Sequence, residues 1–175
     1  MRSMTGRRGL RDVDQHTRTG ARPDLVLCDA MSVIASFTVL NAKLLPDFTA
    51  DPAGVLAAHG HAVSGEYGWS GYVVLAVLDA LEDRGISLSD TGPGEPIGGP
   101  DDDSFYTLLS PEHRRHLPQL DPAGIDAAEF KAIFDEEGLE LDEHESGTAG
   151  RETVTLFRDL IAALADDEVL VVHIG

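Results

Sequence analysis

The feature that most constrains the fold is a pair of strand-like segments near the two ends of the chain. The first, MSVIASFTVL at 31–40, is rich in β-branched and aromatic residues, and all its odd-numbered positions are apolar from Val33 to Val39. The second, EVLVVHI at 168–174, is a similar run. This pattern predicts strands with a well-buried face. Because the sequence between them is mainly helical, we expect an α+β fold with the two strands as neighbours in a small sheet.

Residues 69–84 predict a buried helix that packs across this sheet. A helix that is apolar nearly all round belongs in a protein interior. Gly85 is placed to end it, and the apolar run is shorter than the roughly 20 residues that span a bilayer. Its two apolar stripes are Trp69, Tyr72, Val73, Ala76, Val77 and Ala80 on one side, and Val74, Leu75, Leu78 and Leu81 on the other.

Further helices are expected from their capping signals. Ser110 followed by Pro111 begins one helix, and a capping box of Asp126 and Glu129 begins another. The Gly- and Pro-rich stretch 87–104 predicts a loop, and the acidic stretch 135–150 predicts a mobile connection. The expected helices, apart from 69–84, cover 54–60, 110–117, 126–134 and about 151–165.

Charge divides the chain into two parts. The formal net charge is -18, from 13 basic and 31 acidic residues. Residues 1–30 contain six arginines and four aspartates, so the remainder carries a net charge of -20. We expect 1–30 to be a basic tail that is either disordered or, if translation starts at Met31, untranslated. Residues 31–175 are then a single domain.

The acidic body limits the classes of partner. Such a surface repels phosphate backbones and anionic membranes, so we expect neither nucleic-acid binding nor membrane binding. The acidic surface favours binding to a basic protein partner, or it serves only to keep the protein soluble. Arg7-Arg8 resembles a twin-arginine signal, but the apolar stretch that export requires is missing. Cys28 is the one cysteine, which excludes an internal disulfide. We therefore expect a cytoplasmic protein.

Three aromatic residues, Tyr67, Trp69 and Tyr72, stand at the start of the 69–84 helix. They could form the lip of a binding site or the entry of a buried helix. Trp69 and Tyr72 share a stripe with apolar residues, so we expect them in the core. Tyr67, which precedes the helix, is the better candidate for a surface contact.

His59, His61 and Glu66 are the remaining candidate binding residues. A His-x-His pair with a nearby carboxylate could hold a metal, but two imidazoles at this spacing are a weak signal. Histidines at a helix end also interact favourably with the helix dipole. We predict no metal site and no cofactor.

Known catalytic motifs are incomplete. GWSGY at 68–72 has its second glycine one position too early for a nucleophile elbow, which places Ser70 in the first helical turn instead. GPGEPIGG at 92–99 lacks the strand, lysine and helix of a phosphate loop. The runs that begin at Asp101 and Asp135 lack the ligand spacing of a calcium loop. No catalytic residue is predicted, and His173 is expected to be an ordinary strand residue.

The order of several segments resembles the YfbM-like family of bacterial domains of unknown function. These are EPIGG (95–99), FYTLLSPEHRRHLPQL (105–120) and FKAIFD (130–135), together with the opening strand, the tryptophan-containing helix, and the closing helix and strand. The resemblance implies a small cytoplasmic α+β domain. It supplies no catalytic residues.

Two functions follow as hypotheses. The first is a non-enzymatic protein-binding module that neutralises a basic partner, as toxin-immunity proteins do. The alternative is a small-molecule hydrolase or metal-dependent enzyme in the region of His59, His61 and Glu66. The sequence leaves the oligomeric state open.

Overall fold

The two terminal strands pair with each other at the centre of a four-stranded antiparallel sheet, which confirms the expected α+β fold. The computed structural model describes residues 33–63, 67–88 and 105–175. The strand order is β2-β1-β4-β3. The register of the central pair runs from Ala35 opposite Ile174 to Asn41 opposite Glu168. The strands are β1 (Ala35–Asn41), β2 (His61–Ala62), β3 (Phe105–Leu109) and β4 (Glu168–Ile174).

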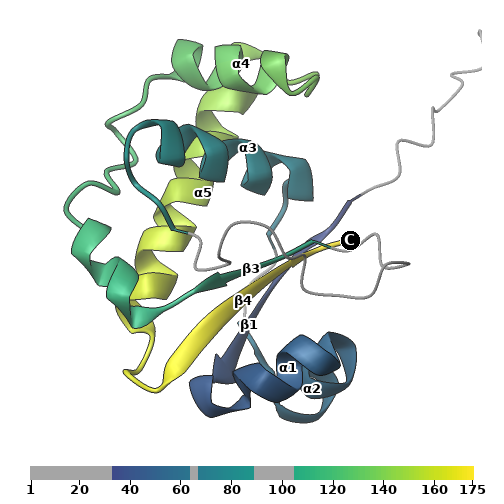
Figure 1. Ribbon diagram of the computed structural model, residues 1–175. Helices are drawn as coiled ribbons and strands as arrows, with labels where there is room; N and C mark the ends of the chain where they lie inside the picture. Colours follow the sequence, from purple (N-terminus) through teal and green to yellow (C-terminus); the bar gives the residue numbers. More distant parts are fainter. Residues whose placement is uncertain (1–32, 64–66, 89–104) are drawn as a thin grey trace, which may run out of the picture. The chain divides into compact units, whose positions relative to one another are not determined.

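Helices cover both faces of the sheet (Figure 1). One face carries α3 (Gly71–Asp83), α4 (Ala127–Glu136) and α5 (Glu143–Ala163). The other carries α1 (Leu45–Ala50) and α2 (Pro52–His59). Two 3₁₀ helices, η1 (Ala42–Leu44) and η2 (Pro111–His116), connect strands to helices. In the part of the chain that the structure describes, no helix combines the length and apolar character needed to cross a membrane.

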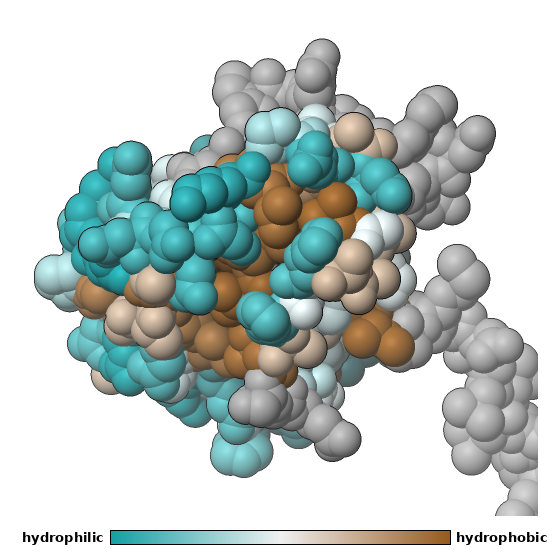
Figure 2. All heavy atoms as spheres, turned by 90° about the horizontal axis from the view of Figure 1, so that it is seen from below, coloured by the Kyte–Doolittle hydropathy of each residue, from teal (hydrophilic) through white to brown (hydrophobic). Residues whose placement is uncertain are grey.

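The α1–α2 face buries a small apolar cluster. Leu40, Val169 and Val171 on the sheet contact Phe48 of α1 and Tyr106 of β3. Apolar residues gather in the middle of the molecule as seen from this side, with hydrophilic residues around them (Figure 2). The α1 helix was not predicted, because a proline in its sequence looked like an interruption; that proline lies in the first turn, where its missing N–H has no cost.

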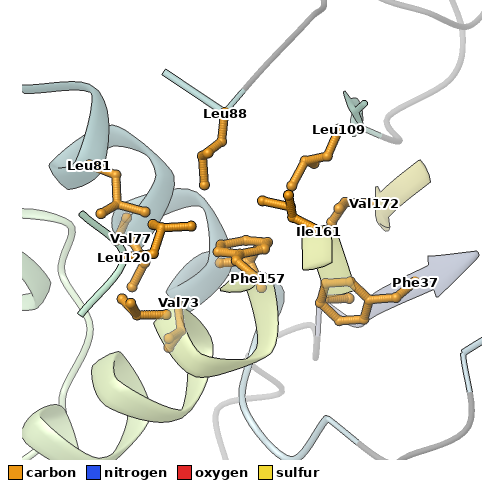
Figure 3. Packing of buried hydrophobic residues seen from close by; sticks show 14 of the residues in the cluster. Phe37, Val73, Val77, Leu81, Leu88, Leu109, Leu120, Phe157, Ile161 and Val172 are labelled. Carbon is orange, nitrogen blue, oxygen red and sulfur yellow. The ribbon is translucent and has the colours of Figure 1, made fainter. Parts of the chain in front are cut away.

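The main core lies between the other face of the sheet and α3 and α5. Figure 3 shows Phe157 of α5 between Val73 and Val77 of α3 and Phe37 of β1. The rings of Phe37 and Phe157 meet edge to face with centroids 6.5 Å apart. The expected buried helix is therefore confirmed. Its C-terminal glycine, Gly85, has a φ of 77°, as a helix-ending turn requires.

Helix α5 corrects the sequence prediction most strongly. The stretch 135–150 was expected to be mobile, but α5 begins at Glu143 and Asp142 caps it by accepting a hydrogen bond from the backbone N–H of Glu145. The first turns of α5 pack on α4 through small residues. A Cβ atom at Gly150 would lie 2.2 Å from the ring of Phe130, and one at Gly147 would lie 2.6 Å from Cβ of Ala127. The first turns of α5 thus pack on α4 through small residues. They do not show the apolar periodicity by which most packed helices are identified from sequence.

The other elements agree with the prediction in part. The N-cap predicted at Asp126 is present, since its carboxylate accepts from the backbone N–H of Glu129 at 2.8 Å, but the carboxylate of Glu129 pairs with Arg84 and is not seen to complete the capping box. The helix expected at 110–117 is a 3₁₀ helix, and β2 and β3 were not predicted. The expectations for residues 1–30, for Glu66 and for 89–104 lie outside the described residues.

Candidate functional site

A groove with a volume of about 620 Å³ borders the outer edge of β1. That edge pairs with β2 only at Thr38 and Val39. The chain returns to it at Ser70, which bridges to Ile34. Residues 64–66, which join these two points along the chain, lie outside the described residues. The lining residues are Ile34, Ala35, Ser36, Phe37, Thr38, Ala62, Val63, Tyr67, Gly68 and Leu156.

The backbone of Ala35 faces this groove. Ile34 exchanges both of its backbone hydrogen bonds with Gly175, each at 3.2 Å. In an antiparallel pair, successive residues direct their N–H and C=O groups to opposite sides. Ala35 therefore directs both groups away from β4. On that side the carbonyls of Val33 and Phe37 accept from Gly71 and Val63, whereas the described residues provide no partner for Ala35.

Tyr67, the residue expected to make a surface contact, is partly buried and forms one wall of the groove. Its ring packs edge to face on Phe37 with centroids 5.5 Å apart, and its hydroxyl lies 2.8 Å from Oγ1 of Thr153. Thr153 donates its own hydrogen to the carbonyl of Ala149, so the Tyr67 hydroxyl is the donor. Burial raises the pKa of Tyr67 to about 12. The phenol is thus held protonated, which does not suit a general base at neutral pH.

The two other aromatic residues near the start of α3, Trp69 and Tyr72, differ in burial. Trp69 is partly buried against the core, and its indole N–H donates to a carboxylate oxygen of Glu152 at 2.7 Å. Tyr72 was expected in the core, which is wrong: it is 51% exposed. The helix begins only at Gly71, with Ser70 as its N-cap. Tyr72 therefore lies in the first turn of α3 with its side chain exposed to solvent, although Ala76, one turn further along the same stripe, is buried.

The predicted binding residues do not converge. His59 lies at the end of α2 and His61 lies in β2, and both are exposed. Neither lines the groove, where Tyr67 is the one predicted residue to appear. Glu66 lies outside the described residues. Within the described ranges, no group of three His, Cys, Asp or Glu side chains is suited to hold a metal ion.

A Ser–His pair in the groove wall was missed by the sequence analysis. Ser36 and His173 lie opposite each other on β1 and β4, with Oγ 3.4 Å from Nδ1. The imidazole stacks on Tyr106 with centroids 4.6 Å apart. A histidine that activates a serine needs its second nitrogen held by an acceptor. Nε2 is buried and has no hydrogen-bond partner among the residues that the structure describes, so we assign this pair no catalytic role. Only the strand register could have revealed the pair.

A second surface feature is an acidic corner between α4 and α5. A glycine-ended turn fixes it: Gly138 has a φ of 73°, and the N–H of Leu139 donates to the carbonyl of Phe134 at 2.8 Å. Seven exposed carboxylates lie within eleven residues, and Lys131 pairs with one of them, Asp135. The acidic corner comprises Asp135, Glu136, Glu137, Glu140, Asp142, Glu143 and Glu145.

Comparison with family models, with curated proteins and with solved structures finds no match. The resemblance to the YfbM-like family therefore remains a prediction.

Proposed function

We propose that this chain is a binding module for a basic protein and that the acidic corner forms the main electrostatic contact. The observation that carries the proposal is the fixed set of seven exposed carboxylates between α4 and α5. Their mutual repulsion raises the free energy of the unbound protein, and a basic partner relieves it. Immunity-type neutralisation of a basic partner is one activity of this kind.

The charges of the whole described surface support the same choice of partner. The described residues contain 21 acidic and 7 basic side chains. Four of the basic residues are already paired with carboxylates of the chain itself, so most acidic groups face solvent without an internal counter-charge; these four are Arg84, Arg114, Lys131 and Arg158. A field of one sign accelerates association with a partner of opposite charge and weakens with added salt.

The test compares two variants with equal loss of charge. The corner variant carries Glu136→Gln, Glu137→Gln, Glu140→Gln and Glu143→Gln, which leave the capping residues Asp142 and Glu145 in place. The control removes four exposed carboxylates elsewhere, through Asp47→Asn, Asp79→Asn, Glu82→Gln and Asp83→Asn. Each immobilised protein is used for affinity capture from native cell extract, and the retained proteins are identified by mass spectrometry.

We expect the wild type and the control to retain the same basic protein at low salt and to release it at 1 M salt, where the screening length is only about 3 Å. The corner variant should not retain it. Equal retention by all three proteins, or retention that is unchanged at high salt, would contradict the proposal, and so would an empty capture by the wild type.

A further inference from the structure

We draw no further inference here: the strongest candidate, the outer face of α2 where Ala53, Ala57 and Ala58 are exposed, is a stripe of small residues, and nothing in the part of the chain that the structure describes shows what covers it.

Discussion

The hydroxyl of Tyr67 donates a hydrogen bond to Oγ1 of Thr153 over 2.8 Å, although the two residues are 86 positions apart in sequence. This bond connects the segment that closes the groove to the middle of α5. Because Thr153 passes its own hydrogen to the carbonyl of Ala149, the bond has a fixed direction. The Tyr67 wall of the groove is therefore tied to the core of the domain at both its ring and its hydroxyl.

The protonation of Tyr67 gives a prediction about alkaline pH. Its pKa is about 12 in the folded protein, against about 10 for an exposed tyrosine. The folded state thus binds the phenol proton of Tyr67 more tightly than the unfolded state does. The contribution of this proton to the free energy of unfolding is complete below pH 10 and is lost as the pH rises through 12. We expect Tyr67→Phe to cost about 1 kcal/mol at pH 8 through the lost hydrogen bond.

Between pH 9 and 12 the variant should lose less unfolding free energy than the wild type, because it lacks this titration. Urea denaturation at pH 8, 9, 10, 11 and 12 measures the difference, and Tyr72→Phe at the exposed position serves as the control. Parallel pH profiles for the wild type and Tyr67→Phe would contradict the assignment.

The close contact of α4 and α5 gives a second prediction. A Cβ atom at Gly150 would meet the Phe130 ring at 2.2 Å, so Gly150→Ala requires the helices to separate or the ring to move. Overpacking of this kind costs about 1–3 kcal/mol, which outweighs the gain of about 1 kcal/mol that alanine brings to a helix interior. Gly68→Ala, where nothing lies within 4 Å, is the control. Urea unfolding should show a lower midpoint for Gly150→Ala alone.

The third prediction concerns Gly85, where a substitution would destabilise the protein through backbone strain and not through overpacking. It has a φ of 77°, and a Cβ atom there would meet nothing within 4 Å. Its N–H donates to Glu82, and the N–H of Ile86 donates to Leu81 at 2.9 Å, which completes the end of α3. Gly85→Ala should therefore cost about 1 kcal/mol through backbone strain alone. Gly85→Asn should recover part of that loss in thermal unfolding; identical melting temperatures for all three proteins would exclude strain.

The sequence predicts the parts of this fold that depend on local patterns. Apolar alternation identified the two terminal strands, and apolar periodicity identified α3, which is confirmed as a buried helix. The first two turns of α5 gave no such signal, because their packed face consists of Ser146, Gly147, Ala149 and Gly150. Small residues that allow close helix contact resemble loop composition when a single sequence is examined.

The groove itself could not be predicted, because it arises from tertiary geometry. It exists where the chain leaves β1 after Val63 and returns at Ser70. Nothing in the local sequence says where along β1 the chain leaves the strand or where it returns. The Ser36–His173 contact likewise depends on the register of two strands that are 137 residues apart. Of the predicted binding residues, Tyr67 lines the groove, because it lies shortly before Ser70, where the chain returns to the edge of β1.

The contact between Trp69 and Glu152 provides the last prediction. Trp69 is the single tryptophan of the chain, so its fluorescence reports on this one place beside the groove. The charge-assisted bond from the indole to Glu152 fixes the ring against the core. Glu152→Ala should free the ring toward water, shift its emission to longer wavelength, and lower the unfolding free energy by about 0.5–1.5 kcal/mol. Glu152→Gln retains an acceptor oxygen and should keep an emission close to that of the wild type. An emission maximum that is the same in Glu152→Ala as in the wild type would show that this bond does not hold the ring in solution.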